Sequence, residues 1–115
     1  MSNILFVCSA NRFRSVLAAE FFRTLLEKNA VGSECVVSSA GIWAEEGAAP
    51  IKEAVQFASS MQVDIESVRS REVNHRIVSD ADLILVMTHD QREAISLEFP
   101  QARDKTFLLS DVTIG

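Results

Sequence analysis

The chain has 115 residues, of which 48% are hydrophobic and 23% charged, and its 11 basic and 16 acidic side chains give a net charge of −5. This length suits one domain with a sizeable core, and the acidic balance argues against a broad nucleic-acid surface while leaving room for a small anion site. The longest apolar runs are far too short to cross a bilayer, and no signal peptide is recognisable. We therefore expect a single domain over residues 1–115, in the cytoplasm, with neither nucleic acid nor a membrane as partner.

The hydrophobic pattern predicts alternating strands and helices. Continuous apolar runs predict buried strands over residues 3–7, 35–39, 82–87 and 105–109. Helical spacing predicts helices over residues 15–28, 51–58 and 90–97, with residues 30–33 ending the first of them and a short helix near 72–76. This alternation is typical of an α/β fold with a parallel sheet and right-handed crossovers.

The two cysteines, Cys8 and Cys35, are too few for a disulfide framework and lack the spacing of a zinc site. We therefore expect a reduced protein, and the reaction mechanism inferred from the motif below needs neither a metal nor a cofactor. Cys35 falls inside the second expected strand, where a structural role is the simplest interpretation.

Cys8 directly follows the first expected strand and so lies at the carboxyl end of the sheet, where α/β proteins bind ligands. The helix that begins nearby presents unpaired N–H groups and positive potential, which bind phosphate and stabilise a thiolate. Arg14 offers a planar fork for two phosphate oxygens, Ser15 adds a hydrogen-bond donor, and Asn11 tolerates a left-handed turn. A lone cysteine at a strand end is more often a small core residue, but the Cys-x5-Arg-Ser spacing indicates covalent phosphoryl transfer through a phosphocysteine.

A wider pattern resembles a known family. The run Val7-Cys8-Ser9-Ala10-Asn11-Arg12-Phe13-Arg14-Ser15, followed by Ala19-Glu20, is similar to the V-C-x-G-N-x-C-R-S-P-x-A-E signature of the low-molecular-weight protein tyrosine phosphatases. The resemblance continues through Ser39-Ala40-Gly41, Ser70-Arg71, the run from Ala81 to Met87, and Leu108-Leu109, and so covers essentially the whole chain. The fold that we predict is a three-layer sandwich with a four-stranded parallel sheet in the order 2-1-3-4, helices on both faces, and a phosphate-binding loop after the first strand.

The resemblance implies a role for each residue of the site. Cys8 would be the nucleophile, Arg14 the phosphate clamp, and Ser15 a hydrogen-bond donor that stabilises the thiolate. Asn11 and Ser39 would brace the loop, and Trp43 would form a wall of the aryl pocket, unless it is merely a half-buried tryptophan. The residues expected to bind phosphate are Ser9, Ala10, Asn11, Arg12, Phe13 and Arg14.

The sequence also departs from the family signature. Ala10 replaces a glycine, which could strain the loop, and Phe13 replaces the second cysteine, which removes the reversible disulfide of the family. Val16 replaces the proline. Arg12 takes a position that is usually apolar, at the mouth of the pocket, where it would either favour an acidic substrate or simply be solvated.

The largest departure concerns the general acid. The family uses the aspartate of an Asp-Pro pair on a loop after the fourth strand, and this chain contains no Asp-Pro pair. We expect that the domain is truncated at its C-terminus, before that loop. Asp111 follows the strand too closely to be assigned, Asp90 is better explained as a helix N-cap, and His75 and His89 as surface residues.

The predicted function is hydrolysis of phosphotyrosine-type aryl phosphate monoesters by a cysteine-dependent phosphatase. Its partners would be a phosphotyrosine-containing protein or a small aryl phosphate, with inorganic phosphate or another oxyanion as product or inhibitor. A thiol-dependent arsenate reductase is one alternative, although residues 88–99 lack the two further cysteines that it needs. A sugar-transport phosphocarrier would not need Arg14 at this spacing, and a non-catalytic phosphate-binding module would not need Cys8.

Overall fold

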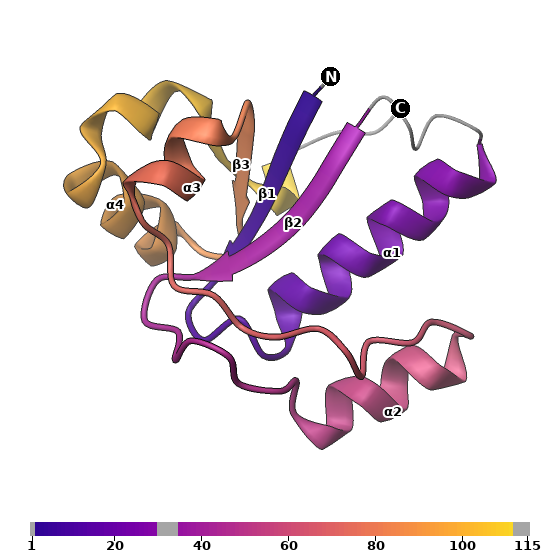
Figure 1. Cartoon of the computed structure of the whole chain (residues 1–115). Coiled ribbons are helices and arrows are strands. Elements are labelled where there is room, and N and C mark those ends of the chain that lie inside the picture. Colours follow the sequence, from indigo (N-terminus) through magenta and orange to yellow (C-terminus); the bar gives the residue numbers. More distant parts are fainter. Residues whose placement is uncertain (1, 30–34, 112–115) are drawn as a thin grey trace.

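The computed structural model describes residues 2–29 and 35–111 of the chain (Figure 1). Residues 30–33, which were expected to end the first helix, and the chain end from residue 112 onward lie outside the described residues. The elements, with η marking a 3-10 helix, are in chain order β1 (Ser2–Cys8), α1 (Arg14–Lys28), β2 (Cys35–Gly41), α2 (Lys52–Ser60), α3 (His75–Asp80), β3 (Leu83–Val86), α4 (His89–Glu98), η2 (Pro100–Lys105), β4 (Thr106–Leu108) and η3 (Leu109–Asp111).

The four strands form one parallel sheet in the order β2-β1-β3-β4, which confirms the predicted fold class and strand order. In the register of β1 with β2, Cys8 pairs with Gly41, and on the other side residues 4–7 pair with residues 83–86 of β3. Because the strands run in the same direction, their carboxyl ends meet at one edge of the sheet. Cys8, the last residue of the central strand β1, therefore lies at that edge.

The central strand β1 is buried on both faces, which is why it reads as a continuous apolar run. Leu5 and Val7 belong to the core cluster under α3 and α4, whereas Phe6 belongs to the cluster under α1. Figure 1 shows α1 and α2 on one side of the sheet and α3 and α4 on the other. The molecule is thus the predicted three-layer sandwich.

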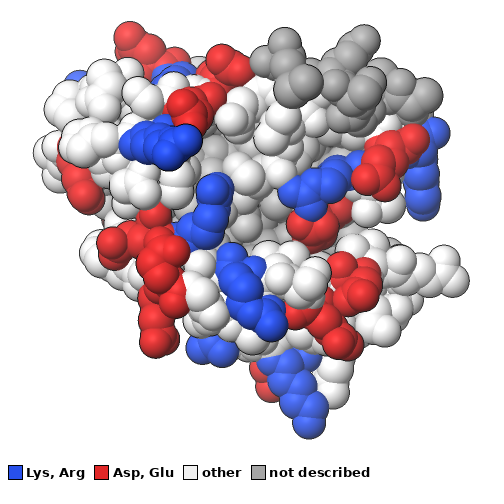
Figure 2. Space-filling view, viewed as in Figure 1, with Lys and Arg blue, Asp and Glu red and all other residues white. Residues whose placement is uncertain are grey.

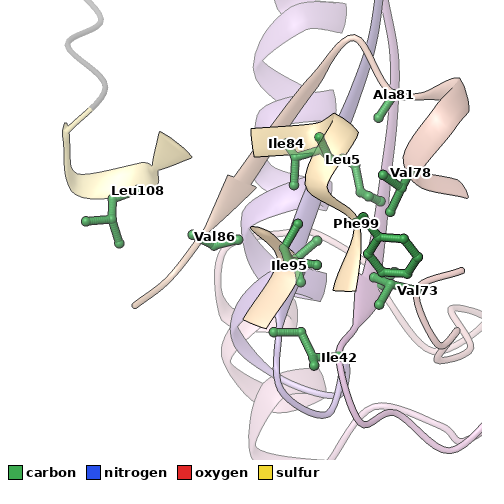
Figure 3. Close-up of a cluster of buried hydrophobic side chains, with 13 residues drawn as sticks. Leu5, Ile42, Val73, Val78, Ala81, Ile84, Val86, Ile95, Phe99 and Leu108 are labelled. Atoms are coloured by element: carbon green, nitrogen blue, oxygen red, sulfur yellow. The ribbon is translucent and has the colours of Figure 1, made fainter. Parts of the chain in front are cut away.

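The larger core cluster fills the layer between the sheet and α3 and α4 (Figure 3). Phe99, which directly follows α4, is 1% exposed and lies beside Val73 and Val78 in this layer. Ile95 of α4 packs toward the sheet residues Ile84 and Val86 in the same cluster. This packing holds α4 against the sheet, and the helix begins three residues after the carboxyl end of β3.

On the opposite face, α1 covers the sheet through Ala19, Phe22 and Leu26. A smaller cluster joins α1 to α2, with Val16 of α1 against Ala54 and Ala58 of α2. A groove of about 420 Å³ opens on the α1 face, and its lining is apolar throughout: Ile4, Phe6, Ala18, Phe21, Phe22, Leu25, Leu83, Leu85 and Leu109.

Two element starts differ from the sequence prediction. The short helix expected near residues 72–76 begins instead at His75, because the Asn74 side chain caps it by accepting the N–H of Ile77 at 2.8 Å. The interpretation of Asp90 as a helix N-cap was wrong. Thr88 is the N-cap of α4, in a capping box with Gln91, and Asp90 lies inside the first turn. The other predicted elements are found with ends shifted by one or two residues.

Within residues 2–29 and 35–111, no helix has both the length and the apolar character needed to span a membrane. The same residues contain no group of three or more His, Cys, Asp or Glu side chains that could hold a metal ion. On the face shown in Figure 2, acidic and basic side chains are interspersed rather than gathered into separate areas.

Candidate active site

Cys8 is held at the edge of the sheet by its neighbours on β1 and β2. It is 4% exposed, and its carbonyl accepts the N–H of Ile42 at 3.0 Å. Its sulfur lies 3.0 Å from the hydroxyl oxygen of Ser15, in the first turn of α1. The structure therefore brings together the thiol and the hydroxyl that the sequence motif predicted to act together.

Asn11 determines the direction of the Ser15 hydroxyl. The Oδ1 atom of Asn11 accepts the backbone N–H of Arg71 at 2.9 Å, which fixes the orientation of the amide, and Nδ2 donates to Ser15 Oγ at 2.9 Å. Because the oxygen of Ser15 accepts this bond, its hydroxyl hydrogen is free to donate to the sulfur of Cys8. A hydrogen bond of this kind stabilises a thiolate.

Asn11 also has the left-handed backbone that this residue type tolerates, with φ at 55°. Asn11 is 1% exposed, and its buried side chain stabilises the loop through its hydrogen bonds to Ser15 and Arg71. Among the described non-glycine residues only Asn11 and Gln62 have a positive φ. Ala10 therefore does not need the freedom of the glycine that it replaces, and the strain expected there is not found.

The loop from Ser9 to Phe13 ends where α1 begins. Phe13 is the N-cap but supplies no side-chain hydrogen bond, and the first turn holds no acidic residue. The N–H of Leu17 donates to the Phe13 carbonyl at 3.0 Å, so the N–H groups before it have no partner within the helix. Together with the helix dipole they produce a positive potential beside Cys8.

A pocket of about 300 Å³ opens over this loop. Phe13 and Ile51 give it apolar walls, and Arg12 and Arg14 bring two guanidinium groups. Arg12 is held in place because its Nε donates to the carbonyl of Ala49 at 2.8 Å. Neither arginine has a carboxylate partner among the described residues. The full lining is Cys8, Ser9, Ala10, Arg12, Phe13, Arg14 and Ile51.

Gly41 allows the loop to approach β2 closely. A Cβ atom at this position would lie 2.7 Å from the Ser9 carbonyl oxygen and 2.9 Å from the Asn11 nitrogen. Both atoms belong to the backbone of the loop between β1 and α1, so they cannot move aside without displacing that loop. Position 41, at the end of the Ser39-Ala40-Gly41 run, therefore requires glycine because a side chain would clash with the loop.

We expect Gly41→Ala to lower the free energy of unfolding by about 1–3 kcal/mol, the usual cost of overpacking, and to reduce kcat/KM markedly because Ser9 and Asn11 move. Thermal unfolding and steady-state kinetics measure the two effects. Gly47→Ala is the control, since a Cβ there meets nothing within 4 Å although φ is +79°. It should cost about 1 kcal/mol of stability and leave kcat/KM unchanged. Equal kcat/KM in both variants would contradict the steric role of Gly41.

Ser39 lies in β2 and Trp43 follows that strand, and neither residue lines the pocket. Trp43 is 70% exposed and reaches the loop through its backbone, whose N–H donates to the Ser9 carbonyl at 2.9 Å. The backbone carbonyl of Ser39 accepts a hydrogen bond from Nε of Arg71 at 3.1 Å. Trp43 is not part of the pocket lining described above, so its role as a pocket wall stays a prediction, as does that of Ser39 as a brace.

Two residues of the site were missed from the sequence. The backbone N–H of Arg71 donates to the Asn11 side chain, and the backbone carbonyl of Arg71 accepts the N–H of Gly41 at 2.8 Å. Gln91 is 3% exposed and donates through Nε2 to Ser9 Oγ at 3.2 Å. The Thr-x-x-Gln capping box was the available signal for Gln91, whereas no local pattern reveals the backbone contacts of Arg71.

None of the candidate acids and bases is among the residues that line the pocket. Asp90, Asp111 and His89 are exposed, and His75 is exposed with its ring packed edge-on against Phe99 at a centroid distance of 4.9 Å. The interpretation of both histidines as surface residues is confirmed. Among the described residues, no Asp or Glu lines the pocket.

The family comparison agrees with this geometry. Residues 3–114 match the model of the low molecular weight phosphotyrosine protein phosphatase family, and the chain belongs to that family. The family is one of cysteine-dependent phosphatases, and relatives of this chain are named as protein-tyrosine-phosphatases.

Relatives with two different substrates resemble this chain. It is 31% identical to a protein-arginine-phosphatase of Bacillus subtilis, over 98% of this chain and 73% of that protein. It is 33% identical to a low molecular weight protein-tyrosine-phosphatase of Acinetobacter johnsonii, over 93% of this chain and 71% of that protein. A solved structure of the YwlE arginine phosphatase, a cysteine-to-serine mutant with a phosphorylated active site serine, superposes with a TM-score of 0.90 at 28% identity, over 95% of this chain and 70% of the other.

Proposed function

We propose that this phosphatase hydrolyses aryl phosphate monoesters, phosphotyrosine among them, through a phosphocysteine intermediate. The observation that carries the proposal is the 3.0 Å contact between Cys8 Sγ and Ser15 Oγ at the N-terminus of α1. A buried thiol within hydrogen-bond distance of a hydroxyl, beside the positive end of a helix and an arginine with no carboxylate partner among the described residues, has the environment of an activated nucleophile.

The first step is attack by the Cys8 thiolate on phosphorus, in line with the aryl oxygen. The S–P bond forms, the P–O bond breaks, and the leaving phenolate takes up a proton. Arg14 and the backbone N–H groups of residues 9–14 hold the three equatorial oxygens, where negative charge is spread. In the second step a water oxygen attacks phosphorus, the P–S bond breaks, and the thiolate and inorganic phosphate are released.

A covalent intermediate on residue 8 has support from a relative. The related arginine phosphatase carries a phosphorylated serine in place of its active-site cysteine. We assign the corresponding role in this chain to Cys8, which lines the pocket beside Arg14. The two proteins would therefore share the covalent step whatever the group from which the phosphoryl is taken.

The charge of the pocket favours an aryl leaving group. Phosphoarginine places a cationic guanidinium directly beside the phosphoryl group. The pocket lining includes Arg12 and Arg14, for which the described residues offer no carboxylate partner, together with the apolar Phe13 and Ile51. A neutral aromatic ring fits these walls, whereas a cation would be repelled. The similarity to the Bacillus subtilis enzyme makes phosphoarginine the second candidate.

Steady-state hydrolysis of phosphotyrosine and of a phosphoarginine peptide tests the substrate class. We expect kcat/KM to be at least about tenfold higher for phosphotyrosine, because like charges a few ångströms apart near a protein surface repel by more than 1 kcal/mol. Arg12→Gln removes one charge and should narrow this ratio, whereas Lys52→Gln, an exposed charge outside the pocket lining, should not. Faster turnover of phosphoarginine by the unmodified chain would overturn the aryl assignment.

p-Nitrophenyl phosphate, measured in the same assay, reports separately on the general acid. Its leaving group needs little protonation, whereas the phenolate of tyrosine needs a proton donor. Comparable rates on the two aryl substrates would mean that residues 1–115 supply the acid, and Asp90→Asn and Asp111→Asn would identify it. Turnover of p-nitrophenyl phosphate alone would show that Cys8 and Arg14 work without one.

A further inference from the structure

Gln91 joins the N-terminus of α4 to the phosphate-binding loop. Its side chain is buried, and its Oε1 atom accepts the backbone N–H groups of Met87 at 2.9 Å and Thr88 at 3.1 Å. Since backbone N–H groups only donate, these two bonds fix which end of the amide is the oxygen. The other end, Nε2, is therefore a donor, and its partner is Ser9 Oγ at 3.2 Å.

This contact determines what the Ser9 hydroxyl can do. An amide nitrogen has no lone pair to offer, so the hydroxyl hydrogen of Ser9 cannot point at Gln91. In the described part of the chain the structure shows no other acceptor for it. The carbonyl of Ser9 is already occupied by the N–H of Trp43. Ser9 lines the pocket together with Cys8. The hydroxyl hydrogen without an acceptor is therefore carried by a residue of the pocket lining.

The arrangement repeats one that already serves Cys8. Asn11 accepts a backbone N–H, donates through its amide to Ser15 Oγ, and leaves the Ser15 hydrogen for the sulfur. Gln91 likewise accepts backbone N–H groups, donates to a serine oxygen, and leaves a hydroxyl hydrogen free. In both cases a buried amide donates to a serine oxygen and leaves the hydroxyl hydrogen for another acceptor.

We propose that Ser9 Oγ donates a hydrogen bond to an oxygen of the phosphoryl group bound in this pocket, and that Gln91 is a positioning residue that orients this donor. The inference rests on the proposed function in placing the phosphoryl group over Cys8. It adds a side-chain donor to the backbone N–H groups and Arg14. The donor is specific to a chain that has serine directly after the nucleophile and a buried glutamine at position 91.

The test uses inorganic phosphate as the probe, because its binding, measured by isothermal titration calorimetry, needs no turnover. We expect Ser9→Ala to raise the Kd of phosphate about tenfold, as for loss of one hydrogen bond to a charged group, and to lower kcat/KM on p-nitrophenyl phosphate by a similar factor. Ser9→Thr keeps the hydroxyl and should restore phosphate binding. Ser60→Ala, an exposed hydroxyl at the end of α2, is the matched control. A wild-type Kd in Ser9→Ala would overturn the proposal.

A double-mutant cycle separates positioning from mere structural support. In Gln91→Glu one carboxylate oxygen still accepts the N–H groups of Met87 and Thr88, but the other can only accept, so it turns the Ser9 hydrogen away from the pocket. We expect this substitution to weaken phosphate binding more in the wild-type background than in Ser9→Ala, with the general effect of the added charge common to both. Equal losses in the two backgrounds would show that Gln91 does not act through Ser9.

The outcomes also distinguish this proposal from the proposed function. If the chain binds phosphate but hydrolyses no aryl phosphate, the proposed function fails, while the phosphate affinities of the Ser9 variants still decide the role of Ser9. If the unmodified chain, folded as judged by circular dichroism, binds no phosphate, both are overturned.

Discussion

Replacement of Cys8 by serine is expected to abolish turnover of aryl phosphates while leaving the phosphate site in place. A serine hydroxyl at this position is not ionised, and a phosphoserine, once formed, is a poor substrate for the second step. Loss of the nucleophile from an enzyme that forms a covalent intermediate costs on the order of 10⁴-fold or more in kcat. Steady-state assay with p-nitrophenyl phosphate measures this loss, and calorimetric titration with inorganic phosphate measures what is retained.

The second cysteine provides the control for this experiment. Cys35 is half-buried in β2, apart from the pocket, and packs against the core cluster under α1. Cys35→Ser should keep full activity, with at most a modest loss of stability from burial of a hydroxyl. Full activity in Cys8→Ser, or loss of activity only in Cys35→Ser, would contradict the assignment of Cys8 as the nucleophile.

Arg14 is expected to show the second large effect. A guanidinium can hold two phosphoryl oxygens at once, which the single ammonium of lysine cannot do. Removing one preorganised donor from an oxyanion site typically costs about 10²–10³-fold in kcat. Arg14→Lys should fall in this range, and Arg14→Ala should be lower still. Measured kcat and KM, together with the Kd of phosphate, test the ordering of these variants.

Arg69 is a matched control for Arg14. It is an arginine whose guanidinium donates to the nearby carbonyls of Glu66 and Val68, outside the pocket lining. Arg69→Lys should leave kcat/KM unchanged, since no contact with the loop is lost. If Arg14→Lys were as active as Arg69→Lys, a bidentate clamp at residue 14 would be excluded.

The fold could be predicted because its signals are local and repeated. The buried strands read as apolar runs and α1 as a periodic helix, and the structure contains both, with the strand order as expected. The elements that shifted depend on side-chain caps. Asn74 caps α3, which begins three residues later than the pattern indicated, and Thr88 rather than Asp90 caps α4. A cap depends on a single side-chain hydrogen bond, which hydrophobic periodicity does not reveal.

The site was predictable only in its contiguous part. The motif from Cys8 to Ser15 predicted a nucleophile and the loop around it, and the structure brings Cys8, Asn11 and Ser15 into hydrogen-bond contact. Two residues that contact the loop from distant positions were missed. Arg71 contacts it through its backbone N–H, and Gln91 contacts it only because α4 packs beside the loop that follows β1. Sequence spacing contains no information about such contacts.

The bond between Asn11 and the backbone of residue 71 has a consequence for the way in which the site comes into being. It joins positions 60 residues apart, so the chain must close a long loop, at an entropic cost, before the turn around Asn11 is stabilised. The contacts of Gly41 with the same loop require β2 to be in place as well. A short peptide containing the signature would therefore have the residues of this loop without its conformation, which is stabilised only when β2 and the segment around Arg71 have come together with it.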